Sequence, residues 1–336
     1  MTISRTSKGV LAAAVLLGAV LPATANARRA APEISEFATF GTGLGSGSTI
    51  GPGGALYVTD GNAGSVVRID SRTGDVSTYA DGLPVQVLGI GGAMDVAFVG
   101  DTAYVLVTLV GGDFVGGGSF GDSTVGIYRL EDDGRFTVIA DIGTWSEDNP
   151  PGPEIDYFLT TGVQYSLETF RNGFLVTDGH HNRVLHVTRN GDISEMVTFG
   201  NIVPTGLERS GATVYVGQTG PVPHEPEDGK VVRFDAKSST VTAVAQGARM
   251  IVDVEMGRGH QLYALSQGVW DGIAEGSPAL DDTGRLVTVE DDGTMTPVVD
   301  GRGNEIVLDR PTSLEFRGRT AYVVSLTGSV YTIENI

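Results

Sequence analysis

Short apolar segments of three to five residues, rich in Val, Leu, Ala and Tyr, recur along the chain after residue 50. Most of them follow a glycine by only a few residues. Apolar runs this short, bounded by turn residues, predict β-strands, and no helical periodicity of useful length follows residue 27. The six copies are residues 55–59, 103–107, 174–177, 214–216, 262–265 and 321–324.

Each copy is followed by another apolar strand, and in the first five units by a hairpin turn and a further strand. Asn190-Gly191 is one such turn, of the kind that joins antiparallel strands. The strands before the turn are 65–70, 125–130, 183–188, 230–235, 285–289 and 329–333, and those after it are 76–80, 136–140, 193–199, 241–245 and 295–299. Each unit is therefore a four-stranded meander of about 40–60 residues, the size of a propeller blade. Because a meander with two apolar faces must pack against neighbours on both sides, the sequence predicts an all-β, six-bladed β-propeller.

The sixth unit has no final strand before the chain ends at Ile336. Residues 34–41 read Ile-Ser-Glu-Phe-Ala-Thr-Phe-Gly, and residues 193–200, at the end of the third unit, read Ile-Ser-Glu-Met-Val-Thr-Phe-Gly. This likeness predicts that the N-terminal strand pairs with 329–333, completes the last blade and closes the ring. Residues 28–336 then form a single domain. An open pair of β-sandwich sheets is the alternative.

Residues 1–27 are typical of a secretory signal peptide. Two basic residues precede an apolar run from Val10 to Val20, and Ala25-Asn26-Ala27 is a small-x-small cleavage site. Because the run is far shorter than the ~20 residues needed to cross a bilayer, we expect no membrane span and a protein secreted to the extracellular space or periplasm. Cysteine is absent, so the stability of the mature chain must come from a packed core.

Acidic residues outnumber basic ones by 41 to 22, and the signal peptide contains two of the basic residues. A surface this acidic repels phosphate backbones and anionic lipids, so nucleic acid and membrane surfaces are not expected as partners. The simplest interpretation of the charge is solubility outside the cell, and we expect a monomer.

The segment from Gly54 to Asp70 resembles the repeat of NHL-type propellers, and the segment from Gly173 to Val187 repeats it loosely. With the signal peptide and the Pro-Thr-Gly-Leu sequence at Pro204, residues 33–336 resemble the ScyD/ScyE family of exported bacterial propellers. The resemblance implies the fold and export, and it implies no enzyme activity. A more distant similarity extends to gluconolactonase-like, strictosidine-synthase-like and streptogramin-lyase propellers, but their metal and catalytic residues do not match this sequence position by position.

Propeller geometry places the loops on two faces. A loop between the second and third strands of a blade emerges on the same face as the link to the next blade. Three of these loops are long, residues 109–123, 219–229 and 267–284, and so is the link 143–161. Because binding residues concentrate in loops held by a rigid scaffold, we expect this side, here called the loop face, to bind the ligand.

Aromatic residues are frequent in these long segments, which contain both tryptophans of the chain. The aromatic residues are Phe114, Phe120, Trp145, Tyr157, Phe158 and Trp270. Trp145 and Trp270 are candidates for lining a pocket for a sugar, a polyphenol or another flat organic molecule. The alternative is that the rings pin the long loops onto the scaffold.

Histidines also lie on this face. His180 and His181 belong to the loop of the third blade, and His224 and Glu225 belong to that of the fourth. Such side chains could act as a general base or as metal ligands. No HxxxH or HExxH spacing supports a metal, and histidines in turns also cap backbone groups, so both interpretations stay open.

Asp95 and Asp253 are the candidate metal ligands. Alignment of the blades on their second-strand tyrosines places Asp95, Gly162, Gly206, Asp253 and Ser313 at one equivalent position near the start of the innermost strand. Blades two and five face each other across the ring, so a divalent cation, Ca²⁺ or Mg²⁺, could bridge the two carboxylates in the central channel. The alternative is that each carboxylate accepts hydrogen bonds from loop amides.

These features predict an exported propeller of unassigned activity that binds a small organic molecule or a protein on its loop face. The alternative is a metal-dependent, lactonase-like hydrolase or lyase acting at the channel mouth. Because no Walker, EF-hand or Gly-x-Ser-x-Gly motif stands in a convincing context, the sequence leaves open whether the protein is an enzyme.

Overall fold

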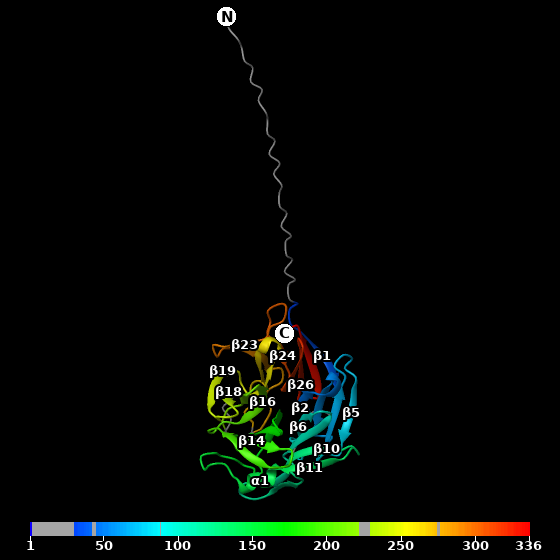
Figure 1. Ribbon diagram of the computed structural model, residues 1–336, viewed down its shortest axis with the longest axis vertical. Coiled ribbons are helices and arrows are strands. Elements are labelled where there is room, and N and C mark those ends of the chain that lie inside the picture. The colour runs from blue at the N-terminus through cyan, green and yellow to red at the C-terminus, as the bar shows by residue number, and fades with distance from the viewer. Residues whose placement is uncertain (2–29, 42–44, 88, 222–228, 274–275) are drawn as a thin grey trace. The chain divides into compact units, whose positions relative to one another are not determined.

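Six sheets follow one another along the chain and form a ring in the computed structural model, which confirms the predicted six-bladed β-propeller (Figure 1). The structure describes residue 1 and residues 30–41, 45–87, 89–221, 229–273 and 276–336. Residues 31–336 belong to one unit, and nearly all of the predicted signal peptide lies outside the described residues. Among the described residues, no helix has the length and hydropathy that crossing a bilayer requires.

The first strand of each blade lines the central channel, and the later strands lie successively outward. Blades one to three are β2 (Gly45–Ile50), β3 (Leu56–Asp60), β4 (Ser65–Ile69) and β5 (Val76–Asp81); β6 (Gly92–Val99), β7 (Thr102–Thr108), β10 (Gly126–Leu130) and β11 (Phe136–Asp141); and β12 (Gln164–Phe170), β13 (Gly173–Asp178), β14 (Arg183–Thr188) and β15 (Ile193–Thr198). Blades four to six are β16 (Pro204–Ser210), β17 (Thr213–Gln218), β18 (Lys230–Asp235) and β19 (Val241–Gln246); β20 (Ile251–Met256), β21 (Leu262–Ser266), β22 (Gly284–Val289) and β23 (Met295–Pro297); and β25 (Pro311–Arg317), β26 (Thr320–Ser325), β27 (Ser329–Glu334) and β1 (Glu33–Thr39).

The N-terminal strand closes the ring, as predicted. β1 pairs antiparallel with β27 from Glu33 opposite Glu334 to Thr39 opposite Ser329. In Figure 1 the blue β1 lies beside the red strands from the end of the chain. Beyond the strand, the backbone N–H of Phe40 donates to the carbonyl oxygen of Gly328 at 2.9 Å. The first and last parts of the propeller therefore share one blade.

Among the described residues, six hydrophobic clusters lie at the contacts between neighbouring blades, and a seventh, smaller one lies under the long loop of blade two. The recurring tyrosines of the second strands take part in these contacts. Tyr57 packs against Phe98 of the next blade with ring centroids 4.6 Å apart, and Tyr263 packs against Phe316 at 4.8 Å. Burial of large apolar side chains stabilises each interface by roughly 1.5–3 kcal/mol per side chain. The repeated tyrosine is thus a packing residue between blades.

The structure departs from the sequence prediction in three places. A hairpin of β8 (Gly111–Asp113) and β9 (Ser119–Asp122) fills the long loop of blade two, and the link to blade three contains α1 (Ile142–Asp148). The last strand predicted for blade five, 295–299, ends at Pro297, and β24 (Val307–Leu308) pairs with β22 beside it. Proline has no N–H to donate to a ladder, which accounts for the early end of β23.

Candidate functional site

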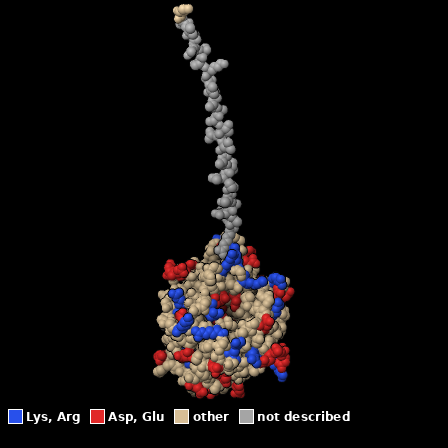
Figure 2. All heavy atoms as spheres, in the orientation of Figure 1, with Lys and Arg blue, Asp and Glu red and all other residues tan. Residues whose placement is uncertain are grey.

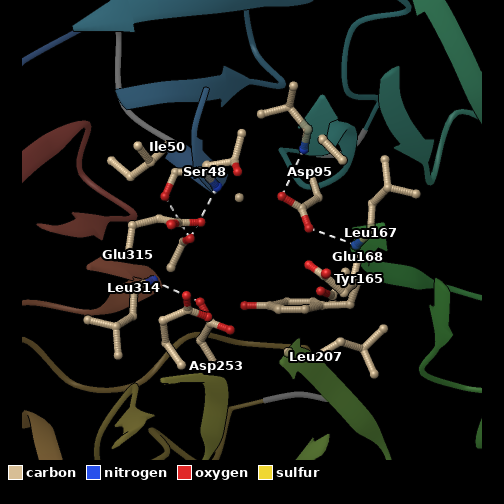
Figure 3. Close-up of a pocket in the computed structure, with 18 of the residues that line it drawn as sticks. Ser48, Ile50, Asp95, Tyr165, Leu167, Glu168, Leu207, Asp253, Leu314 and Glu315 are labelled. Carbon is tan, nitrogen blue, oxygen red and sulfur yellow. Dashed lines mark hydrogen bonds between the residues drawn. The ribbon is translucent and has the colours of Figure 1, made fainter. Parts of the chain in front are cut away.

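The channel contains a cavity of 260 Å³ whose walls are the innermost strands (Figure 3). Asp95 on β6 and Asp253 on β20 face it from opposite sides of the ring. Oδ1 of Asp95 accepts from its neighbour Val96, and Oδ2 accepts from the N–H of Leu167 in the next blade at 2.7 Å. Asp253 repeats the arrangement, because its Oδ2 accepts from the N–H of Leu314 in the next blade at 2.8 Å. Each carboxyl group therefore joins two neighbouring blades.

Glycines in the preceding blades make room for these two carboxyl groups. A Cβ atom on Gly47 would lie 2.2 Å from Oδ1 of Asp95, and one on Gly206 would lie at the same distance from Oδ1 of Asp253. The same arrangement thus occurs twice around the ring. A glycine in blade one or four makes room for an aspartate in blade two or five, and this aspartate accepts from a backbone amide in blade three or six. The hydrogen bonds support the second interpretation of this aspartate pair in kind, but the amides that donate belong to the innermost strands and not to loops.

Strand register corrects the equivalence that the sequence predicted for blade three. In each blade, one first-strand residue pairs with the second-strand tyrosine, and the equivalent position lies two residues before it. This position holds Gly47, Asp95, Gly206, Asp253 and Ser313 in five blades, and it holds Ser166 in blade three. Gly162 precedes β12, so its predicted equivalence was wrong. The reason is that β13 has Leu175 where the other second strands have tyrosine, so counting from tyrosines has no anchor in this blade.

A cation bridging the aspartates would need further ligands. The described part of the chain contains no group of three or more His, Cys, Asp or Glu residues that could hold a metal ion. Both oxygens of each aspartate already accept an amide hydrogen bond. The oxygen atoms of the two aspartates do not by themselves complete the six-to-eight-oxygen shell of Ca²⁺ or the octahedron of Mg²⁺.

Glutamates follow the aspartates toward the face opposite the loop face. Glu168, Glu255 and Glu315 line the same cavity, and Nε of Arg209 lies 3.8 Å from Oε1 of Glu168. Burial raises the pKa of Glu168 to about 7, with Glu208 adding to the effect, and burial likewise raises the pKa of Glu255 and Glu315. In Figure 2 acidic atoms occupy the hollow near the centre of the molecule. Carboxyl groups gathered this closely disfavour a bound anion wherever they are ionised.

The aspartates also have raised pKa values. Burial raises the pKa of Asp253 to about 7 against the lowering effect of its amide hydrogen bonds, and burial raises that of Asp95 well above its ordinary range. Both groups therefore take up protons at a pH where exposed aspartates are fully ionised.

Tyr165, the second residue of β12, divides the channel. Its side chain extends across the channel, and its hydroxyl donates to the carbonyl oxygen of Thr312 on the opposite blade at 3.2 Å (Figure 3). Burial and the nearby Asp253 and Asp95 raise the pKa of Tyr165, so the phenol stays protonated. Tyr165 and Thr312 line both the channel cavity and a second cavity on the loop-face side. The tyrosine ring is therefore the partition between the two cavities.

The second cavity, here called the loop-face cavity, has a volume of 240 Å³ and lies at the mouth of the channel. Residues from blades one, two, three, five and six and their links surround it. The lining residues are Gln86, Gly89, Ile90, Gly91, Met94, Tyr165, Gln267, Gly276, Pro278, Thr312 and Leu326. Apolar side chains form most of the wall and a few amide and hydroxyl groups interrupt it, which is the usual composition of a small-molecule site.

The predicted histidines are packed within the structure. His180 and His181 are buried, and their rings contact Phe158 and Tyr157 of the long link edge to face. Nδ1 of His181 lies 2.9 Å from Nη2 of Arg183, and Nε2 lies 3.3 Å from the carbonyl oxygen of Leu159. This geometry supports the interpretation that aromatic and histidine rings fix the link to blade three.

The tryptophans have similar surroundings. Trp145 on α1 lies over the guanidinium of Arg183 at 4.9 Å, and Nε1 of Trp270 donates to Oγ of Ser277 in its own loop at 2.8 Å. Neither tryptophan nor His180 or His181 lines the loop-face cavity. His224 and Glu225 lie outside the described residues. A ligand-binding role for these six residues stays a prediction.

Sequence reasoning missed the residues that do line the cavity. Gln86, Tyr165 and Leu326 belong to no motif, and the chain separates them widely. One local signal was present in Gly89-Ile90-Gly91, since both glycines have positive φ and a Cβ on Gly91 would lie 2.4 Å from that of Leu109. Glycines in the sequence indicate a tight backbone approach, but only the fold shows that this approach forms part of the cavity wall.

Comparison with known proteins supports the fold. No family model and no curated protein matches the chain. Among solved structures, a gluconolactonase from Xanthomonas campestris is 12% identical, with a TM-score of 0.59 over 90% of this chain and 89% of that one. Virginiamycin B lyase from Staphylococcus aureus is 13% identical, with a TM-score of 0.53 over 91% of this chain and 100% of that one. A PQQ-bound aldose sugar dehydrogenase from Streptomyces coelicolor is 13% identical, with a TM-score of 0.55 over 91% and 98%. The chain thus shares the β-propeller fold of these proteins.

Proposed function

We propose that this protein is an exported propeller that binds a small organic molecule in the loop-face cavity. The observation that carries the proposal is the convergence of five blades and their links on one largely apolar cavity at the channel mouth. Its 240 Å³ is below the roughly 300–1,000 Å³ of pockets for drug-sized ligands, so the ligand is small, about the size of one substituted ring. Among the described residues that line it, Tyr165 is the only titratable one, which favours binding over hydrolysis.

Filling the cavity tests the proposal. Leu326 is half-buried at the cavity wall, and Leu326→Trp would occupy the space that a ligand needs. A metabolite screen by ligand-observed NMR should yield compounds that bind the mature protein and lose binding in Leu326→Trp. Val241→Trp is the control, because Val241 is exposed on an outer strand. Binding that survives Leu326→Trp would reject this cavity as the site.

The proposal includes export and a relationship to ScyD/ScyE-like propellers. The signal-peptide pattern of residues 1–27 and the NHL-like repeat at Gly54 support it. We expect a secreted product that begins at Arg28, and its intact mass is the measurement. A product that keeps residues 1–27 in a membrane fraction would contradict export.

The second candidate function is a lactonase-like hydrolase or a lyase, since two structural neighbours are a gluconolactonase and virginiamycin B lyase. Glu168 and Asp253, with pKa values raised by burial to about 7, favour it because such groups can exchange protons at neutral pH. We expect this function to show as lactone opening that Asp253→Asn reduces at least tenfold, with elemental analysis reporting any Ca²⁺ or Mg²⁺. If no lactone is opened with or without added cations, the enzymatic function is rejected and the binding function remains.

A further inference from the structure

The link between blades one and two exposes apolar side chains on the loop face. Val85 and Val87 are 53% and 48% exposed, and Ile90, at the rim of the loop-face cavity, is 44% exposed. The backbone of the link is held by blade one, because the N–H of Gln86 donates to the carbonyl oxygen of Gly61 at 2.9 Å. Exposed apolar side chains gathered on one fixed segment are typical of a contact surface.

The β8–β9 hairpin extends this surface. Val87 lies beside the hairpin, since its Cγ2 atom is 3.6 Å from the position of a Cβ on Gly121. Val115, in the turn of the hairpin, is 57% exposed, and its N–H donates to the carbonyl oxygen of Phe158 in the link to blade three at 2.8 Å. The surface here called the apolar patch consists of Val85, Val87, Ile90 and Val115.

Acidic residues flank the apolar patch. Asp81 ends β5 directly before the link, and Asp113 and Asp122 end β8 and β9. All three are exposed. Between Arg72 and Arg129 the sequence contains no lysine or arginine, so no basic residue of these segments offsets the acidic ones.

The link to blade three, which packs against the hairpin, adds further acidic residues. Its exposed acidic residues are Glu147, Asp148, Glu154 and Asp156. Residues 136–170 contain no lysine or arginine. A positively charged partner of the apolar patch is therefore attracted by the neighbouring link as well.

Charge decides among the partners that could cover the apolar patch. The acidic residues repel an anionic lipid surface. A second copy of the chain in two-fold contact would bring the same acidic residues against one another. A polypeptide with lysine or arginine beside apolar side chains complements both parts of the surface at once.

We infer that the apolar patch docks a basic polypeptide, whose apolar side chains cover Val85 and Val87 and whose lysine or arginine side chains face Asp113 and Asp122. This docking goes beyond the proposed binding of a small molecule and does not depend on it. Ile90 belongs to both surfaces, whereas Val85 and Val87 do not line the loop-face cavity.

Selection of a phage-displayed library of random peptides on the immobilised mature protein tests the inference. We expect enriched peptides to combine aliphatic or aromatic residues with lysine or arginine. In fluorescence anisotropy, synthetic copies should bind at least about tenfold more weakly to the double variant Val85→Ser/Val87→Ser. Val138→Ser/Val241→Ser is the matched control, since these valines are 39% and 38% exposed on outer strands, and it should leave the affinity unchanged.

A second pair of variants tests the acidic part of the surface. Asp113→Asn/Asp122→Asn should weaken peptide binding about threefold or more at low salt and less at high salt, because salt screens exposed charges. Asp101→Asn/Asp132→Asn, in exposed turns of the opposite face, is the control and should leave the affinity unchanged.

The inference is overturned if no peptide is enriched, or if the valine double variant binds the enriched peptides as tightly as the wild type. A dimer in sedimentation velocity, or binding to phosphatidylglycerol vesicles, that this variant abolishes would assign the patch to another partner and overturn it too. The same variant should still bind small molecules in the loop-face cavity, so the two proposals fail separately. Thermal melts verify the fold, and Val85→Thr/Val87→Thr replaces the serine variant if that variant unfolds.

Discussion

Buried acidic residues of this propeller have two different environments. Asp178 contacts the buried Arg183 at 3.0 Å and His181 at 3.2 Å. Burial alone would raise the pKa of Asp178, but these two neighbours outweigh it and hold the pKa below its ordinary value. Asp95 and Asp253 have backbone amides instead of cations, and burial raises their pKa. Asp178 therefore belongs to a structural ion pair, whereas Asp95 and Asp253 are carboxyl groups that hold protons near neutral pH.

Loss of Arg183 should be severely destabilising. Arg183→Met leaves Asp178 buried without its cation and removes the hydrogen bonds to Asn149 and Ser146 that fix the long link. Breaking a buried pair costs about 3–5 kcal/mol, and urea unfolding should show a loss of at least about 3 kcal/mol. Arg135→Met is the control, since Arg135 is 83% exposed and should cost less than about 0.5 kcal/mol. Equal losses in both variants would contradict this account of the pair.

The channel carboxyl groups predict an inverted pH dependence of stability. Their raised pKa values mean that the folded state binds more protons than the unfolded state between about pH 4 and 7. Stability then falls as the pH rises through this window, whereas the lowered pKa of His186 opposes the trend with one group. We expect Tm to be higher at pH 5.5 than at pH 8.5 by about 5 °C or more. Asp253→Asn should reduce the difference, and a higher Tm at pH 8.5 would refute the assignment.

At the scale of elements, the fourth strands explain why the ring closes where it does. β1 and β15 carry the same Ile-Ser-Glu opening, and each has a bulge at the same place, between Glu36 and Ala38 in β1 and between Glu195 and Val197 in β15. The bulge sets the twist at which the outer strand leaves its blade. The repeated sequence thus encodes a strand of the same shape in both blades.

Removal of residues 31–40 should destabilise the whole propeller. Ala38 and Phe40 are buried in the cluster between blades six and one, and the edge of β27 would lose its partner. The loss of about 5 kcal/mol should lower Tm by roughly 10 °C or more. Phe37→Met with Ala38→Val, which reproduces the β15 sequence, is the matched control and should melt within about 3 °C of the wild type. Unchanged melting of the truncated chain would refute closure by β1.

The elements were largely predictable from sequence because their signals are local. Strand and turn residues repeat in every blade, and the likeness of residues 34–41 to 193–200 located the closing strand. α1 was missed because its seven residues are too few for a helical pattern, although Asp141 caps it through the N–H of Thr144. The β8–β9 hairpin was missed because glycines interrupt it.

At the scale of the whole molecule, the loop-face cavity exists only after the ring closes. Gln86, Tyr165 and Thr312 come from different blades, and no short-range pattern relates them. The loop-face cavity lies on the side that the sequence analysis favoured, but Trp145, Trp270, His180 and His181 do not line it, and their role in binding stays a prediction. The residue types that stand out in the sequence indicate where the stiff loops are. The residues that line the cavity lie on or beside the inner strands, and only packing across the channel axis brings them together.

A crystallographic fragment screen of the mature protein at neutral pH tests the central claim most directly. The account predicts small, largely apolar fragments in the loop-face cavity, packed against Ile90, Met94 and Leu326. Fragments that leave this cavity empty and collect in the groove between blades four and five, beside Arg233 and His260, would contradict it.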